Sequence, residues 1–156
     1  MDEQKKLHLL ASLAHELNAQ GITWSLGTSC FLYLKGIAPT FHDLDLMVAF
    51  RDVEKAEAIL ARRGQRQPDH YDRAKFGTKV FAEYVVEGVD IDLMADFSII
   101  KDGKEYFFPL EEKSIVERYS LEGERIPLES LAIWRQRYCL MGREEKVRMI
   151  DASLKR

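Results

Sequence analysis

The sequence contains little cysteine, no long apolar stretch and no large excess of charge of either sign. Cys30 and Cys139 are the two cysteines among 156 residues, and they lie far apart without the spacing of metal ligands. Cys30 stands in an apolar run, which favours a small buried side chain over a disulfide. Since a chain of this length buries most of the surface that its unfolded form exposes, neither a disulfide nor a structural metal is needed for stability.

No apolar stretch approaches the roughly 20 residues that cross a bilayer, and residues 1–6 are charged rather than apolar. We therefore expect a cytoplasmic protein without a membrane segment. The formal net charge is -3, whereas proteins that bind duplex nucleic acid depend on Lys and Arg to neutralise phosphates. Duplex nucleic acid is therefore not an expected partner, but a local basic pocket for one triphosphate is compatible with this charge.

Apolar periodicity and turn residues divide the chain into helices and strands. The expected helices cover residues 3–20, 30–35, 52–63, 127–141 and 144–154, and the expected strands cover 22–26, 44–50, 79–86 and 89–94. Two hairpins are expected, with turns at Asp102-Gly103 and Glu122-Gly123. This order predicts a single α/β (α+β) domain over residues 1–156, with a mixed sheet, flanking helices and a C-terminal helical extension over 127–156.

Two carboxylates occupy alternate positions at the start of an apolar strand. Asp43 and Asp45 point to the same face of that strand, with Cα atoms ~6.5–7 Å apart. Mg²⁺ or Mn²⁺ prefers such oxygen ligands. A second apolar strand carries Asp90 and Asp92, again on one face, so the residues leave the third ligand open between these two. We favour Asp92 because the apolar residues that follow it continue the strand.

A glycine turn precedes the first acidic strand. Gly27 stands between a short strand and a short helix, where it lets the backbone approach a phosphate, and Thr28 or Ser29 can add a hydroxyl donor. The same three residues are also typical of an ordinary helix start with an N-cap hydroxyl. The position of the turn, one short helix before an acidic strand, is what favours phosphate binding.

Together these motifs resemble the polymerase β-like nucleotidyltransferase superfamily, in particular its small stand-alone bacterial-type members such as antibiotic nucleotidyltransferases. The resemblance implies the nucleotidyltransferase fold, with Asp43 and Asp45 as the metal-binding pair. Asp92 would be the third carboxylate, which ligates the catalytic metal and acts as general base, and Gly27, Thr28 and Ser29 would form the phosphate-contacting turn.

The resemblance also implies a Mg²⁺- or Mn²⁺-dependent reaction. A nucleoside monophosphate would pass from a triphosphate such as ATP to a hydroxyl of a small molecule or a protein, with release of pyrophosphate. Two departures from the family pattern are present: Thr28 replaces the usual Gly or Ser, and 39–42 lack the basic residue that many small members place before the first Asp.

Two other functions stay open. A non-catalytic binding module, for example an antitoxin-like subunit, would keep the acids and use its surface for a protein partner or a second copy of the chain. A metal-dependent phosphohydrolase would use the same clustered acids for hydrolysis. The basic residues of the C-terminal helices either reach a triphosphate or only complement the helix dipoles; these are Arg135, Arg137, Arg143 and Lys146.

Overall fold

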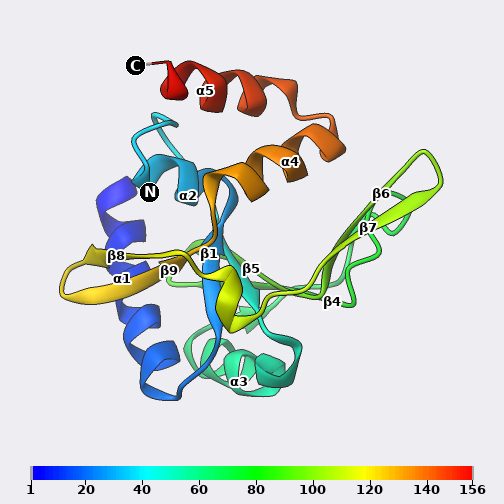
Figure 1. Ribbon diagram of the computed structural model, residues 1–156. Helices are drawn as coiled ribbons and strands as arrows, with labels where there is room; N and C mark the ends of the chain where they lie inside the picture. The colour runs from blue at the N-terminus through cyan, green and yellow to red at the C-terminus, as the bar shows by residue number, and fades with distance from the viewer. Residues whose placement is uncertain (1, 156) are drawn as a thin grey trace.

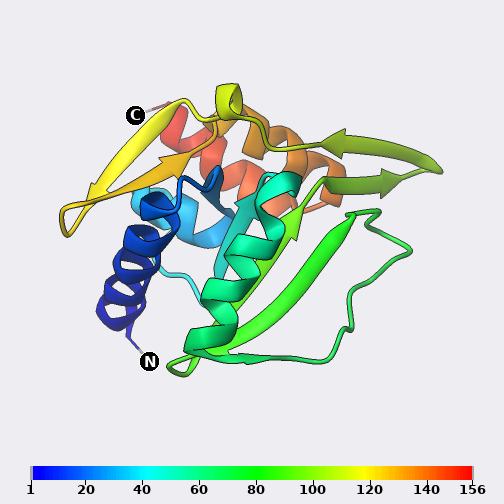
Figure 2. The ribbon, with the colours of Figure 1, turned by 90° about the horizontal axis from the view of Figure 1, so that it is seen from below.

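The computed structural model describes residues 2–155, which form a five-stranded mixed sheet packed between helices, with two separate hairpins (Figures 1 and 2). The helices are α1 (Glu3–Ala19), α2 (Thr28–Leu34), α3 (Val53–Arg63), α4 (Leu131–Met141) and α5 (Glu144–Leu154), with short 3-10 helices η1 (Phe50–Asp52) and η2 (Glu112–Ser114). The strands are β1 (Trp24–Gly27), β2 (Leu44–Val48), β3 (Gln65–Arg66), β4 (Val80–Val86), β5 (Val89–Ala95), β6 (Phe97–Lys101), β7 (Lys104–Phe108), β8 (Glu117–Leu121) and β9 (Glu124–Leu128).

The strand order in the sheet is β1-β2-β5-β4-β3, and only β2 and β5 run parallel. Figure 2 shows α1 and α3 on the same side of this sheet. Figure 1 shows α5 above α2, with α4 to the right of α2. This α+β architecture with a mixed sheet, flanking helices and a C-terminal helix pair confirms the expected fold class.

The register of the sheet aligns four residues in one row. Gly27 pairs with Asp45, Asp45 with Asp92, and Asp92 with Glu83. Because directly opposed residues point to the same face of a sheet, three carboxylates lie side by side across three adjacent strands. The opposite face is apolar, as shown by the fully buried Leu46 of β2.

Local signals explain most element ends. The Asp2 carboxylate accepts a hydrogen bond from the Lys5 backbone N–H at the start of α1 (2.9 Å), and Ser130 caps α4 in the same way. At the predicted Asp102-Gly103 turn both residues have positive φ (52° and 75°), as a type I′ turn requires. The hairpin predicted at Glu122-Gly123 is also present, as β8–β9.

Several predictions from the sequence were wrong in detail; for example, the helix expected over 30–35 already begins at Thr28. Helix α4 begins at Leu131 rather than at residue 127, because Leu128 pairs with Glu117 in the β8–β9 hairpin. The strand expected over 44–50 ends at Val48, and a 3-10 turn follows. Asp52 does not cap α3 with its side chain; its carboxylate accepts the Thr23 backbone N–H instead (2.9 Å).

The core between these elements is largely apolar but contains a buried ion pair. Arg137 of α4 and Glu129 are 2% and 4% exposed and are joined by two hydrogen bonds of 3.0 and 2.8 Å. The Ser25 hydroxyl of β1 also donates to Glu129 (3.2 Å). The pair therefore ties the C-terminal helices to the edge of the sheet that carries Gly27.

Cys30 is buried, as expected, whereas Cys139 is exposed, and both are free thiols. Within residues 2–155, none of the helices combines the length and the apolar character needed to cross a membrane.

Candidate functional site

Three carboxylates converge at the middle of the sheet. Asp43 lies directly before β2, Asp45 lies within β2, and Asp92 lies within β5. One oxygen from each of the three lies within 4.8 Å of the others. The parallel pairing of Asp45 with Asp92 brings together two segments that are far apart in sequence, so the sequence-based grouping of these three acids is present in the structure.

The electrostatics of this carboxylate cluster favour a cation. Burial, followed by the charges of Asp43 and Asp92, raises the pKa of Asp45 well above its usual range. Burial and the charge of Asp43 also raise the pKa of Asp92, to about 6. Within residues 2–155, no Lys, Arg or His side chain forms an ion pair with any of the three acids. Like charges at this distance therefore repel one another without a neutralising partner.

One oxygen of the cluster has no hydrogen-bond partner. Asp45 is 7% exposed, its Oδ2 accepts a hydrogen bond from the Thr28 hydroxyl, and its Oδ1 is buried with no donor in reach. A buried carboxylate oxygen without a partner costs about 1–3 kcal/mol or more. Divalent Mg²⁺ or Mn²⁺ takes oxygen ligands of this kind, so the donor set and its unsatisfied atom fit such a metal.

The Gly27 turn lies beside this cluster. Gly27 is extended (φ -120°), and a Cβ at this position would lie 2.5 Å from Cζ2 of Trp134. A glycine is therefore required here for the packing of α4, whatever the turn binds. Thr28 adopts a left-handed φ of 52°, which directs its hydroxyl to Asp45. Ser29 follows in the first turn of α2 and is half-buried.

The structure separates Asp92 from its neighbour Asp90. Asp90 lies outside the carboxylate cluster and is exposed, with its carboxylate 3.3 Å from Nε2 of the exposed His42. Asp92, which we favoured as the third acid, is therefore the residue whose carboxylate lies beside those of Asp43 and Asp45.

The arginines of the C-terminal helices pair with acids of the same region. Arg135 binds Asp151 with two hydrogen bonds (2.7 and 2.9 Å), and Arg137 is buried against Glu129. Arg143 contacts Glu145 (2.8 Å). The geometry thus favours a structural role for these arginines over contact with a triphosphate.

Sequence reasoning missed an apolar cavity next to the cluster. Its volume is about 200 Å³, and Asp92 and Thr28 form part of its wall. Trp134 of α4, expected only as core, also lines it. The sequence signal that could have indicated this cavity is the alternation in β4. Phe81 and Glu83 share one face of β4, and Asp92 lies on the same face of the neighbouring strand.

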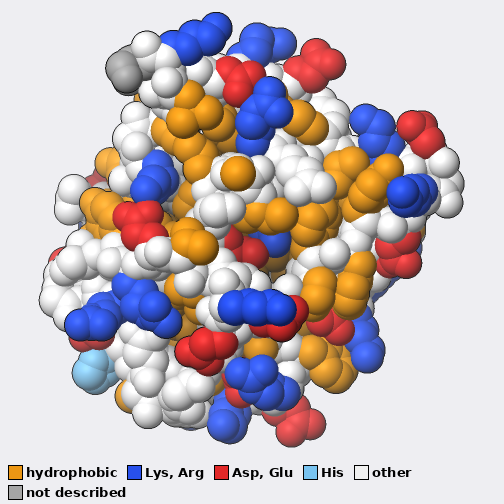
Figure 3. Space-filling model, viewed as in Figure 1, with side chains coloured by type: hydrophobic (Ala, Val, Ile, Leu, Met, Phe, Trp, Pro, Cys, Tyr) orange, Lys and Arg blue, Asp and Glu red, His pale blue; other side chains and the backbone are white. Residues whose placement is uncertain are grey.

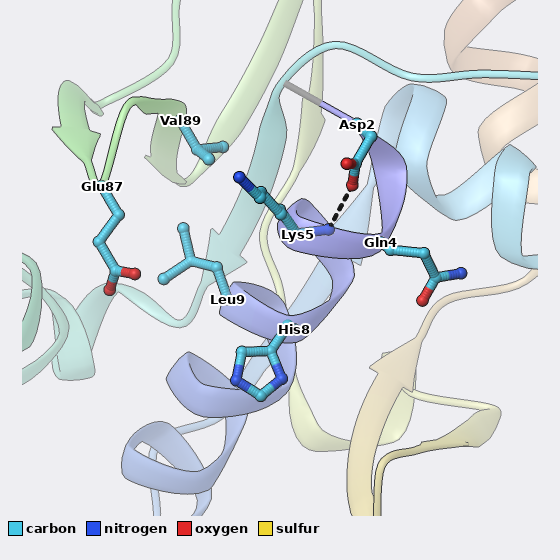
Figure 4. A pocket seen from close by; sticks show the side chains of 7 residues that line it. All are labelled: Asp2, Gln4, Lys5, His8, Leu9, Glu87 and Val89. Carbon is cyan, nitrogen blue, oxygen red and sulfur yellow. Dashed lines mark hydrogen bonds between the residues drawn. The ribbon is translucent and has the colours of Figure 1, made fainter.

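A larger hollow, about 540 Å³, lies elsewhere, between the start of α1 and the turn before β5 (Figure 4). Its lining mixes Lys5, His8 and Glu87 with apolar Leu9 and Val89. None of the three clustered carboxylates reaches it. The cavity beside Asp92 is smaller, but it adjoins the carboxylate cluster.

No protein-family profile and no curated protein sequence matches this chain. Solved structures do match it in fold. A provisionally assigned nucleotidyltransferase from Thermotoga maritima superimposes with a TM-score of 0.77 at 22% identity, over 99% of this chain and 96% of that one.

Two antibiotic-modifying proteins are also similar. The antibiotic-resistance factor ANT(2″)-Ia matches with a TM-score of 0.69 at 13% identity, over 98% of this chain and 86% of its own; it has also been solved with adenylyl-2″-tobramycin. The lincosamide antibiotic adenylyltransferase LnuA, with lincomycin bound, matches with a TM-score of 0.55 at 14% identity, over 86% of this chain and 84% of its own. At these identities the likeness is one of fold.

Proposed function

We propose that this chain, which has the nucleotidyltransferase fold, acts as a member of the polymerase β-like superfamily and transfers a nucleoside monophosphate from a nucleoside triphosphate to a hydroxyl group. The observation that carries the proposal is the convergence of Asp43, Asp45 and Asp92 within 4.8 Å around a buried oxygen that lacks a partner. Asp43 and Asp45 would hold the metal pair together with Asp92.

The reaction is an in-line displacement at the α-phosphorus. The acceptor oxygen forms a bond to phosphorus, the bond from phosphorus to the β-phosphate oxygen breaks, and pyrophosphate leaves. Divalent ions held by the carboxylates would neutralise the charge on both the attacking and the leaving oxygens. The acceptor proton passes to Asp92, the carboxylate of the cluster that also borders the neighbouring cavity and so can act as general base.

The Gly27 turn would receive the leaving phosphates. Gly27 pairs with Asp45 at one end of the acidic row, and the Thr28 hydroxyl beside it already donates to the Asp45 carboxylate; Ser29 is the next residue along the turn. We propose ATP as the nucleotide to test first, because two of the proteins similar in fold are named for adenylyl transfer or hold an adenylylated product. A small molecule is the acceptor that we propose to test before a protein.

Product analysis tests this function. Purified protein, Mg²⁺ and each of the four triphosphates are incubated with a panel of hydroxyl-bearing small molecules, and pyrophosphate and free phosphate are measured separately. We expect pyrophosphate, in amounts matching the nucleotidylated product. Asp45→Asn should lower the rate by about three orders of magnitude, since metal charge stabilisation is worth several kcal/mol and 1.4 kcal/mol is about tenfold. Free phosphate as the primary product would instead support a phosphohydrolase.

One observation favours a second candidate, a non-catalytic binding module with a protein partner. Arg135, Arg137 and Arg143 all engage neighbouring acids, whereas binding of a triphosphate usually requires basic groups. A folded protein that binds none of the four nucleotides with Mg²⁺, yet elutes as a stable hetero-complex with another protein, would support this second function.

A further inference from the structure

The cavity beside Asp92 has aromatic walls. Five rings border it: Tyr71, Phe76, Phe81, Phe97 and Trp134. We call this space the aromatic cavity. Tyr71 stacks on Phe81 with a centroid separation of 3.9 Å, and it also stacks on Phe76 at 5.3 Å. In Figure 3 apolar side chains gather on this face over the β6–β7 hairpin and beneath α4, the elements that supply Phe97 and Trp134.

The sheet register places the aromatic cavity next to the carboxylate row. Phe81 of β4 pairs with Met94 of β5, and the next pair on the same face is Glu83 with Asp92. Residues two apart on a strand are ~6.5–7 Å apart. A ring held between Phe81 and Trp134 would therefore present a substituent at its edge directly to the Asp92 carboxylate.

The side of the site on which the cavity lies identifies its occupant. In an in-line displacement the attacking and leaving oxygens stand on opposite sides of phosphorus. The proposed place for the leaving phosphates is the Gly27 end of the acidic row. The aromatic cavity runs alongside the acidic row: Thr28 and Trp134 line it toward the Gly27 turn, and Phe81 of β4, with Tyr71 stacked on it, lines it beyond Asp92. The Phe81 end, away from the proposed place of the leaving phosphates, is the side from which the acceptor hydroxyl approaches.

The lining determines the chemistry that the cavity can recognise. Asp92 is the only charged group among the described residues that line it, and the Tyr71 hydroxyl is already hydrogen-bonded to Thr78 (2.9 Å). A polycationic sugar would leave several ammonium groups there without partners, which is costly. A neutral ring instead removes apolar surface from water, at about 25 cal/mol per Å².

The volume limits the size of the ring. The aromatic cavity holds about 200 Å³, whereas an apolar cavity of about 150 Å³ is enough for benzene. Resting on the proposed transfer function, we infer that the acceptor is a neutral, apolar ring compound, of one ring or two fused rings, that carries its reactive hydroxyl at the ring edge or on a short arm. The ring fills the aromatic cavity and the hydroxyl meets Asp92.

Tryptophan fluorescence measures this binding independently of transfer. The described chain has one indole in the cavity, Trp134, and one in the core, Trp24, so Trp24→Phe leaves a single reporter. We expect 2-phenylethanol to change the emission of Trp134 saturably. Its half-saturating concentration should be at least about tenfold lower than that of tobramycin. Met141→Trp, which enlarges a side chain lining the cavity, should weaken this binding at least about tenfold when followed by calorimetry. The matched Met141→Leu variant should change it less than about twofold.

Four results would overturn the inference. Tobramycin binding as tightly as 2-phenylethanol would show that the site selects charge rather than a neutral ring. Displacement of 2-phenylethanol by adenosine would assign the cavity to the nucleotide. Binding of Mg²⁺ and ATP without any binding of ring alcohols would refute this inference alone, whereas ring binding without nucleotide binding would refute the proposed transfer and with it the acceptor role.

Discussion

Asp45 and Asp92 lie directly opposite each other on the parallel strands β2 and β5, with their carboxylates on one face of the sheet. Two like charges side by side in a largely buried position oppose folding unless a proton or a cation neutralises them. The fold thus holds an arrangement that is unfavourable in the metal-free protein and that a divalent ion at the proposed site would stabilise.

The first consequence is a pH dependence of stability in the metal-free protein. The pKa of Asp92 is raised to about 6 in the folded state, against about 3.9 for an ordinary Asp. The folded protein therefore binds this proton more tightly than the unfolded chain does, and its free energy of unfolding falls as pH rises from about 4 through about 6.

Thermal unfolding in EDTA of the wild type and of Asp92→Asn checks this expectation. At pH 7.5 the variant should unfold several degrees higher than the wild type, because 1 kcal/mol shifts the midpoint of a domain of this size by about 2–4 °C. At pH 4 the difference should nearly vanish. Asp90→Asn, on the same strand but outside the cluster, is the control. An equal shift at both pH values would contradict the account.

The contact between Gly27 and Trp134 predicts a strong coupling between the two positions. Gly27→Ala should destabilise the protein by about 1–3 kcal/mol, because the new methyl group would overlap the indole. Its φ of -120° suits any residue, so the cost comes from packing alone. In a Trp134→Leu background the same change should cost much less. Denaturant unfolding of the four proteins measures the coupling, and additive effects would count against this contact.

The buried pair of Arg137 and Glu129 should contribute far more than its exposed counterpart on the same helix. Arg137→Met leaves a buried carboxylate without its partner and should cost about 3–5 kcal/mol. Arg135→Met breaks a pair with Asp151 in which both side chains are about 40% exposed (43% and 40%), and it should cost at most about 1 kcal/mol. Urea unfolding of the two variants compares them. Similar losses would mean that burial does not govern these two pairs.

The sequence predicted the parts of the site that depend on local spacing. Asp43 and Asp45 follow from strand alternation, and the turn residues of both hairpins follow from backbone preference. Asp92 could be favoured over Asp90 but not fixed, because the choice depends on the register between β2 and β5, which no local pattern encodes. Leu128 shared the spacing of the next helix and was assigned to it, although tertiary pairing with Glu117 places it in a strand.

The parts that could not be predicted all depend on distant contacts. Arg137 is typical of a solvated helix face until its partner Glu129, which also accepts from Ser25, is known to meet it. The aromatic cavity likewise collects residues from six helices and strands and from the loop before β4. Composition shows that the rings exist, but only the fold shows that they surround one space beside Asp92.

Titration calorimetry with ATP tests the central claim most directly. ATP would be added in the presence and absence of Mg²⁺ to the wild type, to Asp45→Asn and to the control Asp90→Asn. The account predicts Mg²⁺-dependent binding in the wild type and in Asp90→Asn, and loss of that binding in Asp45→Asn with the fold unchanged by circular dichroism. Equal binding in all three proteins, or none in the folded wild type with any of the four triphosphates, would contradict a nucleotide site at the three carboxylates.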